Sequence, residues 1–428
     1  MSPSTLDQAY REATKCNRCG FCQTACPVYQ VTRKESSTAR GHHYQVRSTF
    51  EGRLPVSPGL TQPLDECLLC RACVPQCAPR VQTDQVVAGA RHALSRNDGR
   101  TSVLTTLLRR LLLRPGRLDR YVGLASRAEA MGVFDVAALG GRNLSRARHL
   151  VGHLPSRSFL AGAKGITSQV PAGKERVAYF VGCGVNHLLP EIGEATVGVL
   201  QALGYGVSVS RSYCCGLPSY ANGDLDTARR LARGNLRLLK HNNVASVVTD
   251  CASCSSFLKG YAELLEDDPA FGPLASEFSE KVLDITELLA RSTYEPQSSE
   301  LPLKVTYHDP CHASRYQGLK EEPRSILRSI PGLTLIEMQE ADWCCGGAGT
   351  YSIKHPDLSD RILDRKIDNV ARTGADLLVT SCPSCIIQLS SGVRRHNLPV
   401  KVLHLSLVLA MARTGGLPNR TRGDNTSG

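Results

Sequence analysis

Cysteines at close, repeated spacing are the residues of this chain best suited to chemistry. Of its 18 cysteines, eight form two runs with the spacing C-x2-C-x2-C-x3-C. The runs are Cys16, Cys19, Cys22 and Cys26, then Cys67, Cys70, Cys73 and Cys77. Pro27 follows the first run directly, and Pro79 follows the second after one residue. Soft thiolates gathered in this way select iron-sulfur clusters or zinc.

The spacing within each run indicates how the clusters would be held. Three thiolates at two-residue gaps wrap one face of a [4Fe-4S] cubane, whereas the fourth, before the proline, reaches the other cluster. We therefore expect one cluster on Cys16, Cys19, Cys22 and Cys77, and the other on Cys67, Cys70, Cys73 and Cys26. Gly20 suits a loop whose backbone approaches inorganic sulfide. Zinc is the alternative, but its motifs normally pair two C-x2-C knuckles across a longer gap.

The other ten cysteines form two sets of five with one spacing. In each set a single cysteine precedes an adjacent pair with glycine after it, and a C-x2-C motif closes the set. The first set is Cys183, Cys214, Cys215, Cys251 and Cys254, and the second is Cys311, Cys344, Cys345, Cys382 and Cys385. His187, His308 and His312 lie near the first cysteine of a set and could ligate metal or relay protons. A histidine near a strand end is more often a hydrogen-bonded neighbour of a site.

A duplication positions the two sets of five. Each copy alternates apolar strands with amphipathic helices, from "VAYFVGC" to "CASC" and from "VTYHDPC" to "CPSC". Related text closes each copy, "KVLDITELLA" at 281 and "KVLHLSLVLA" at 401. This alternation predicts a parallel sheet in each copy. Every cysteine then falls at the sheet edge where open α/β folds place ligands.

Five zones follow along the chain, and together they predict an α+β protein. Residues 1–80 carry the four-cysteine runs, 81–175 are a basic segment, 176–295 and 296–412 are the two copies, and 413–428 are a polar tail that we expect to be disordered. Within the basic segment we expect helix to about residue 130, interrupted at Pro115 and Gly116. From 137 to 175 the Gly/Ser-rich text predicts an extended connector.

The net charge of +12 is concentrated in the basic segment. Residues 80–176 hold 17 Lys and Arg against six Asp and Glu, a balance of +11 that should face an acidic partner or an anionic membrane. A leucine stripe runs beside Arg109, Arg110, Arg114, Arg117 and Arg120. We favour packing of this stripe on the α/β domains over a membrane contact in the plane of the bilayer. Nucleic-acid binding is disfavoured, because no aromatic residues interleave with the arginines.

The N-terminus lacks an apolar export segment, and no run of about 18 apolar residues occurs. We therefore expect a cytoplasmic protein, with peripheral attachment to the inner face of the cell membrane as an open alternative. Neither a G-x-G-x-x-G fingerprint after a strand nor a P-loop is present. The chain is thus expected to carry electrons without binding a flavin or nicotinamide itself.

The motifs "YCCG", "WCCGG", "CASC" and "CPSC" resemble the CCG (cysteine-rich) domains of the heterodisulfide reductase catalytic subunit. The separation of the two four-cysteine runs resembles the helical ferredoxin domain of succinate dehydrogenase-type iron-sulfur subunits. Joined in this order, over about residues 10–412, they resemble the iron-sulfur subunit of glycolate oxidase and its relatives acting on lactate. Arg40 and Gly41 sit where that family has an Arg-Gly pair, although His42 and His43 depart from its usual text.

The resemblance implies noncubane [4Fe-4S] clusters in the five-cysteine sets, where Gly216, Gly346 and Gly347 would clear space for the backbone; one zinc per copy is the alternative. It implies an electron-transfer subunit that receives electrons from a separate FAD subunit oxidising glycolate, lactate or a similar 2-hydroxy acid. Quinone or another protein would be the acceptor. Two further functions stay open: a thiol-disulfide oxidoreductase that uses a noncubane cluster, and a scaffold whose cysteine-rich domain holds zinc.

Overall fold

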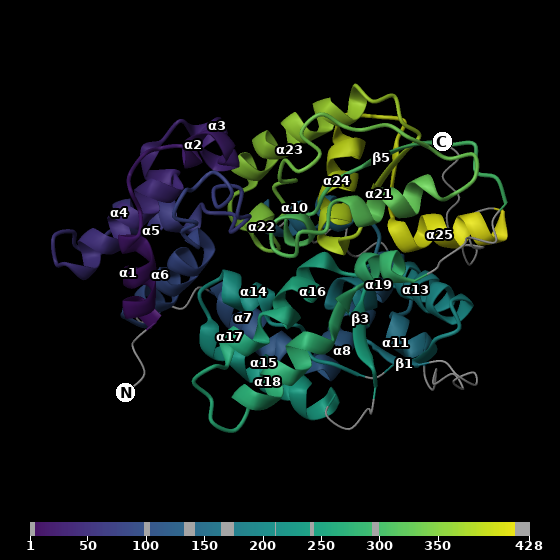
Figure 1. The fold of residues 1–428 in the computed structure, drawn as a ribbon, viewed down its shortest axis with the longest axis horizontal. Helices are drawn as coiled ribbons and strands as arrows, with labels where there is room; N and C mark the ends of the chain where they lie inside the picture. The colour runs from purple at the N-terminus through teal and green to yellow at the C-terminus, as the bar shows by residue number, and fades with distance from the viewer. Residues whose placement is uncertain are drawn as a thin grey trace.

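The computed structural model describes residues 5–97, 103–131, 142–163, 175–209, 211–239, 244–292 and 299–415. A helical N-terminal domain lies beside two α/β units, one above the other in Figure 1. Two four-stranded parallel sheets and a helical domain confirm the predicted fold class.

The N-terminal domain is built from short helices that separate the two cysteine runs. They are α1 (Thr5–Thr14), α2 (Cys22–Ala25), α3 (Pro27–Thr32), the 3-10 turn η1 (Glu35–Ser37), α4 (Ala39–Phe50), α5 (Pro58–Asp65) and α6 (Thr83–Asn97). Helix α1 packs on α4 and α6 around Val46, Leu64 and Val86. Thr38 caps α4, because its hydroxyl accepts a hydrogen bond from the Gly41 N–H at 3.1 Å. The domain thereby holds both cysteine runs on one small apolar core.

The first α/β copy contains a parallel sheet of order β2-β1-β3-β4. Its strands are β1 (Arg176–Tyr179), β2 (Gly206–Val209), β3 (Ser246–Thr249) and β4 (Val282–Asp284). Its helices are α12 (Cys183–His187), α13 (Pro190–Ala202), α14 (Leu217–Ala221), α15 (Leu225–Leu239), α16 (Ala252–Lys259), α17 (Tyr261–Leu264), α18 (Gly272–Lys281) and α19 (Ile285–Arg291). Strand β3 is buried along its whole length, as expected for a parallel strand covered on both faces.

The second copy repeats this topology with the order β6-β5-β7-β8, which confirms the predicted duplication. Its strands are β5 (Lys304–Tyr307), β6 (Thr334–Leu335), β7 (Leu377–Thr380) and β8 (Lys401–His404). Its helices are α20 (Cys311–Ser314), α21 (Glu321–Arg328), α22 (Tyr351–Lys354), α23 (Pro356–Ala371), α24 (Pro383–Arg395) and α25 (Leu405–Thr414).

The two copies pack on each other through equivalent elements. Helix α25 of the second copy contacts α13 of the first, and α19 of the first contacts α21 of the second. In the duplicated text α19 corresponds to α25 and α13 to α21, so the contact is reciprocal. Buried polar groups cross it as well: Thr196 Oγ1 bonds Ser406 Oγ at 2.9 Å, and His404 Nε2 lies 2.8 Å from the Asp250 carbonyl oxygen. Both sheets therefore share one apolar core.

The basic segment packs on both copies. Helices α7 (Val103–Leu112) and α8 (Pro115–Ala130) meet at the predicted break before Pro115. Leu112 is buried in the core of the α/β units, which agrees with the packing interpretation of the stripe, whereas Leu107 is 51% exposed. Arg109 and Arg110 are exposed.

The expectation of an extended connector at 137–175 is wrong where the structure describes it. Helices α10 (Arg142–Val151) and α11 (Phe159–Gly162) lie within that range. Arg146 pairs with Asp360 of α23, and Leu150 and Phe159 are buried. Contacts with the α/β units stabilise these helices although their sequence has weak periodicity. Of the predicted disordered tail, 416–428 fall outside the described residues.

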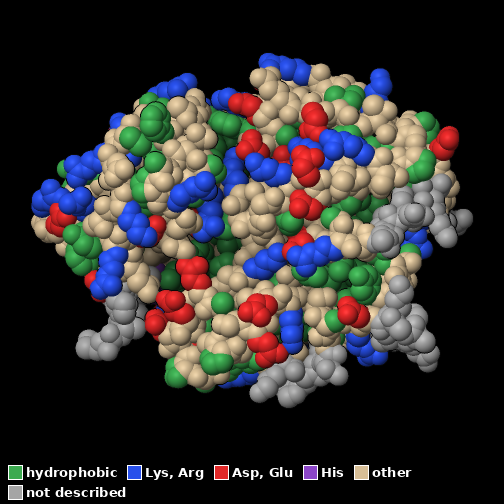
Figure 2. Space-filling view, in the orientation of Figure 1, with side chains coloured by type: hydrophobic (Ala, Val, Ile, Leu, Met, Phe, Trp, Pro, Cys, Tyr) green, Lys and Arg blue, Asp and Glu red, His purple; other side chains and the backbone are tan. Residues whose placement is uncertain are grey.

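Lys and Arg side chains are spread over the N-terminal domain, at the left of Figure 2. Among the described helices, none has both the length and the apolar character needed to cross a bilayer. Most of the cysteines, the candidate metal ligands, are buried in the interior.

Candidate metal centres

The two four-cysteine runs follow the same backbone path. Residues two and four positions after the first cysteine have left-handed φ angles in both: Arg18 at 56° and Gly20 at 88°, then Leu69 at 53° and Arg71 at 56°. These turns aim successive thiols toward one side of the loop. At Gly20 a Cβ atom would also lie 2.6 Å from Arg40 Nη1, so the guanidinium approaches the backbone closely here, and the approach of inorganic sulfide stays a prediction.

Arg40 explains the Arg-Gly pair noted in the sequence. Its Nη1 donates to the Arg18 carbonyl oxygen at 3.3 Å, and its Nε pairs with Glu35. The guanidinium charge acts on the Cys19 and Cys22 thiols, and counters part of the burial that raises the pKa of Cys22. A Cβ at Gly41 would lie 2.3 Å from the Glu35 carbonyl oxygen. The pair thus holds the first run and lowers its negative charge.

Cys26 lies with the second run although it belongs to the first in sequence. Burial, together with the neighbouring Cys70 and Cys67 thiols, raises the pKa of Cys26 to about 12. Cys73 has Cys70, Cys67 and Cys26 as charged neighbours. Cys77 packs against the same apolar core as both Cys16 and Cys67, so this contact assigns it to neither cluster. The position of Cys26 is the one that crossed ligation requires, while ligation itself stays a prediction.

The first five-cysteine set converges at the carboxyl edge of its sheet. Cys183 begins α12, and its Sγ lies 3.9 Å from Cys214 Sγ. Hydrogen bonds from the Cys214 and Cys254 thiols lower the pKa of Cys215 to about 5. Buried polar groups hold the pair from behind: Asn235 Nδ2 donates to the Cys214 carbonyl oxygen at 3.2 Å and Tyr261 Oη to that of Cys215 at 2.6 Å.

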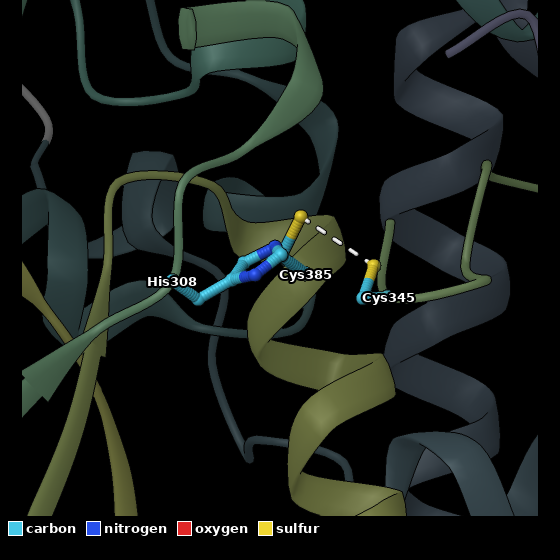
Figure 3. Close-up of side chains that lie close together, drawn as sticks. All are labelled: His308, Cys345 and Cys385. Carbon is cyan, nitrogen blue, oxygen red and sulfur yellow. Dashed lines mark hydrogen bonds between the residues drawn. The ribbon is translucent and has the colours of Figure 1, made fainter. Parts of the chain in front are cut away.

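The second set converges in the same way, with different neighbours. Cys345 Sγ lies 3.6 Å from Cys385 Sγ, and the Cys344 thiol interacts with the Cys311 thiol. A nitrogen of His308 joins Cys345 and Cys385, with the three ligand atoms within 4.8 Å of one another (Figure 3). Lys366 stands where the first copy has Asn235; it is fully buried and its Nζ donates to the Ala341 carbonyl oxygen at 3.0 Å. Burial lowers the pKa of Lys366 to about 8, against the thiols of Cys345 and Cys344.

The two sets form one continuous series of thiols, which the sequence analysis did not anticipate. The Cys251 and Cys382 thiols lie near enough to interact across the copies, and the Ala252 N–H donates to the Ser381 carbonyl oxygen at 3.1 Å. At the other end the Cys70 thiol interacts with that of Cys344. Reciprocal packing of the copies creates the first junction, and docking of the N-terminal domain creates the second. No motif in the sequence could have shown either.

A buried guanidinium marks the junction with the N-terminal domain. Arg315 Nη1 donates to the Cys70 carbonyl oxygen at 3.3 Å, and Nη2 donates to that of Asp342 at 2.6 Å. The thiols of Cys70, Cys311 and Cys344 raise its pKa. Arg315, four residues beyond Cys311, was missed in the sequence, where nothing distinguishes it from other arginines.

Of the three candidate histidines, His308 is the one whose ring nitrogen lies in a group of potential metal ligands with cysteine thiols. His187 Nδ1 lies 3.7 Å from Asp119 Oδ1 of α8. His312 Nδ1 lies 2.7 Å from Ser256 Oγ, and its ring stacks on Tyr316. A cavity of about 910 Å³ lies beside His312 and is lined by nine of the ten cysteines of the two sets.

These donors fit iron-sulfur clusters or zinc. Iron-sulfur clusters and zinc both prefer thiolate ligands. Buried thiolates repel one another unless a positive charge, such as that of a metal, compensates them. Both ring nitrogens of His308 are buried without a hydrogen-bond partner among the described residues. Such a polar group calls for a partner outside the chain.

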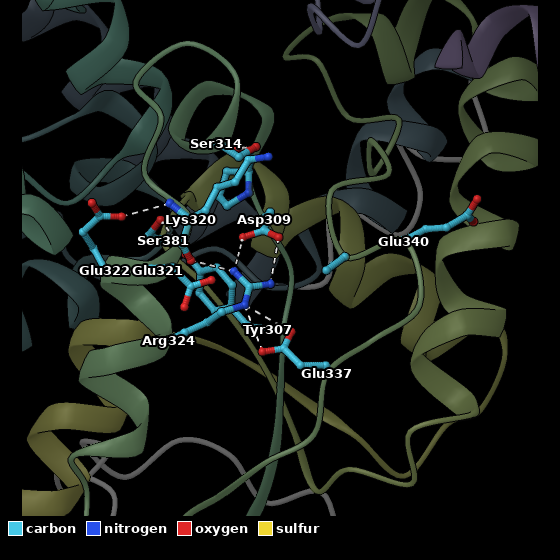
Figure 4. A network of polar contacts seen from close by, with 12 residues as sticks. Tyr307, Asp309, Ser314, Lys320, Glu321, Glu322, Arg324, Glu337, Glu340 and Ser381 are labelled. Atoms are coloured by element: carbon cyan, nitrogen blue, oxygen red, sulfur yellow. Dashed lines mark hydrogen bonds and ion pairs between the residues drawn. The ribbon is translucent and has the colours of Figure 1, made fainter. Parts of the chain in front are cut away.

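An ion pair supports the loop that carries His308 and Cys311. Arg324 of α21 pairs with both Asp309 carboxylate oxygens, at 2.9 and 3.0 Å, and its Nε lies 2.9 Å from Glu337 Oε1 (Figure 4). The Asp309 side chain is 6% exposed and that of Glu337 48%. The buried Asp309 carboxylate thus depends on Arg324 to balance its charge, whereas water solvates the Glu337 carboxylate.

Arg324→Met should lower the free energy of unfolding by about 3–5 kcal/mol, because it leaves the Asp309 charge buried and unpaired. Glu337→Gln, which removes the solvated partner, should change it by about 0–1 kcal/mol. Anaerobic guanidinium unfolding measures both. Equal stability of the two variants would contradict the support assigned to Asp309.

Comparison with known proteins agrees with this architecture. Residues 12–81 match the model of the 4Fe-4S dicluster domain, and residues 177–259 and 305–390 match that of the cysteine-rich domain, CCG.

One relative matches nearly the whole chain, and shorter relatives match about half of it. The chain is 30% identical over 417 residues to a probable glycolate oxidase iron-sulfur subunit of Bacillus subtilis, with 94% of each chain covered. It is 31% identical to lactate utilization protein A of an Exiguobacterium species, over 54% of this chain and 96% of the relative. It is 30% identical to lactate utilization protein A of Oceanobacillus iheyensis, over 56% of this chain and 99% of that protein. The chain therefore belongs to the family of the glycolate oxidase iron-sulfur subunit and lactate utilization protein A, and is itself an oxidoreductase subunit with a 4Fe-4S dicluster domain and two CCG domains.

Proposed function

We propose that this chain is the electron-transfer subunit of a flavin-dependent 2-hydroxy-acid dehydrogenase complex. A separate FAD subunit would oxidise glycolate, lactate or a similar acid, and quinone or another protein would be the acceptor. The observation that carries the proposal is the continuous series of thiols from Cys70 through Cys344 and Cys382 to Cys183. A scaffold of closed zinc sites needs no such continuity, because four ligands complete each site by themselves.

The proposed cofactors are two cubane clusters in the N-terminal domain and noncubane clusters in one or both CCG domains, with zinc as the alternative there. When bound, iron-sulfur clusters accept and release single electrons. The protein holds the thiols in place and sets the surrounding charge. Arg40, Arg315 and Lys366 each place a positive charge beside a different group of thiols. Such charges stabilise thiolates and favour the reduced form of a bound centre.

The exposed arginines of α7 and of the turn before α8 would contact the partner. Arg109, Arg110 and Arg114 are exposed, while Leu112 of the same segment is buried in the core. The helix is thus anchored by its apolar face with its charges free for an acidic surface, on the flavoprotein or at the membrane.

The cavity of about 910 Å³ supports a second candidate function, the reduction of a disulfide at a noncubane cluster. It is lined by thiols of both sets and by His312, so a substrate sulfur could reach either centre. A stoichiometric spectral change on adding a disulfide, without any flavoprotein, would favour this function.

Crossed ligation predicts that Cys→Ala variants within one four-cysteine run alter the EPR signals of different clusters. Cys26→Ala should alter the EPR signal that Cys70→Ala alters, and Cys77→Ala the signal that Cys19→Ala alters, in anaerobically purified protein. Unmodified protein should contain about sixteen irons if all four sites hold four-iron clusters. Signals that group Cys26 with Cys19 would refute the crossing, and about eight irons with zinc would refute the noncubane assignment alone.

Division of labour between subunits predicts that the isolated chain does not oxidise 2-hydroxy acids with artificial acceptors and gains this activity when the flavin subunit is added.

Charge-guided docking predicts slower electron transfer as salt rises, since the Debye length is about 10 Å at 0.1 M. Changing Arg109, Arg110 and Arg114 together to Glu should slow it further at low salt. Full activity of the lone chain would refute the division, and salt-independent coupling would refute the docking surface.

Lys366→Met should lower the midpoint potential of the second CCG centre, because reduction adds negative charge that the ammonium stabilises. A shift of roughly 60 mV corresponds to about 1.4 kcal/mol for one electron. EPR-monitored redox titration measures it, with Asn235→Met in the first copy as the matched variant that removes no charge. Equal shifts in the two variants would show that packing, and not charge, sets the potential.

A further inference from the structure

The duplication offers an internal comparison for His308. The segment Tyr179-Phe180-Val181-Gly182-Cys183 of the first copy corresponds to Tyr307-His308-Asp309-Pro310-Cys311 of the second. The backbone N–H of Phe180 donates to the Val248 carbonyl oxygen at 2.8 Å, and that of His308 donates to the Val379 carbonyl oxygen at 2.9 Å. These bonds join equivalent strands, so the two side chains leave the sheet at the same point. The first copy has a benzyl group where the second has an imidazole.

The fold does not need an imidazole at this position. Phe180 is 1% exposed within the apolar core, and His308 is buried to the same extent. Neither nitrogen of His308 has a hydrogen-bond partner among the described side chains and backbone. An unsatisfied buried polar group is destabilising, and Phe180 fills the same position in the first copy without one.

The ring faces the metal-binding thiols. In Figure 3 His308 projects from the end of β5 toward Cys385, at the start of α24, and Cys345, in the loop before α22. One imidazole nitrogen and the two Sγ atoms lie within 4.8 Å of one another. This spacing matches ligands around one metal, since donors about 2.0–2.3 Å from an ion lie close to 4 Å apart. Three separate elements deliver them.

We propose that His308 supplies a nitrogen ligand to the metal centre of the second five-cysteine set, which makes this centre a mixed nitrogen-sulfur site and leaves the first an all-sulfur site. The inference rests on the proposed function in one respect, that the second set holds metal. The metal is one that accepts both thiolate and imidazole, either the iron of a cluster or zinc. A neutral imidazole that takes a coordination position otherwise filled by one of the five anionic thiolates makes the donor set less negative, and in iron-sulfur centres this raises the potential.

Isotope-edited spectroscopy tests the ligand directly. The full chain would be purified without oxygen, once with ¹⁴N-histidine and once with ¹⁵N-histidine, and its second centre examined by pulsed EPR if it holds iron, or by zinc-edge X-ray absorption if it holds zinc. We expect a histidine-nitrogen coupling that changes with the isotope, or an imidazole scattering pattern. Either signal should be lost in His308→Phe, the residue that the first copy carries, and kept in His312→Asn.

The outcomes separate this proposal from the function. Phenylalanine is accommodated at the equivalent position, so His308→Phe should retain its secondary structure and the spectra of the other centres. A signal that survives in His308→Phe, or its absence from wild-type protein that holds full metal, would overturn nitrogen ligation and leave the electron-transfer function intact. Metal content unchanged when Cys345 and Cys385 are both replaced by Ala would also overturn nitrogen ligation, because the second set would then hold no metal, and would leave electron transfer to the other centres.

Discussion

Burial of thiols against one another is the constraint on which the rest of this structure depends. The ten cysteines of the two sets and Cys70 lie close to one another, and hydrogen bonds between thiols shift some of their pKa values in opposite directions: bonds from Cys214 and Cys254 lower the pKa of Cys215, while hydrogen bonds with Cys215 and Cys251, together with burial, raise that of Cys254. Without positive charge such a group could not ionise together. The guanidinium of Arg315 and the ammonium of Lys366 supply part of that charge, and a bound metal would supply the rest.

Reciprocal packing brings the thiols together. Because α25 packs on α13 and α19 on α21, the two C-x2-C loops face each other, and Cys251 meets Cys382. The N-terminal domain docks on the second copy, where Tyr316 Oη donates to the Leu69 carbonyl oxygen at 2.7 Å beside the Cys70–Cys344 contact. The same interfaces that bury apolar surface therefore place the candidate centres next to one another.

The two copies share a scaffold and differ in the residues around their thiols. Tyr179 and Tyr307 occupy one position, and both are buried. Behind the adjacent cysteines, however, Asn235 in the first copy is replaced by Lys366 in the second. A neutral amide and an ammonium both hold backbone carbonyl groups, but only the ammonium adds charge. Duplication followed by such exchanges gives one fold two different electrostatic environments around its thiols.

Cysteine spacing and hydrophobic periodicity were sufficient to predict the cluster-binding runs, the two sets of five, the duplicated parallel sheets and the break at Pro115, because these features depend on residues near in sequence. Helix α10 was missed, since Arg146 needs Asp360, more than 200 residues away, to hold it. The contacts Cys70–Cys344 and Cys251–Cys382, the charge of Lys366 beside Cys345, and the choice of His308 over His187 and His312 were likewise hidden. The order of residues is enough to identify the side chains that can bind metal. Which of them meet depends on the folded chain, because contacts between domains arise from the packing of whole helices and sheets and leave no local pattern in the sequence.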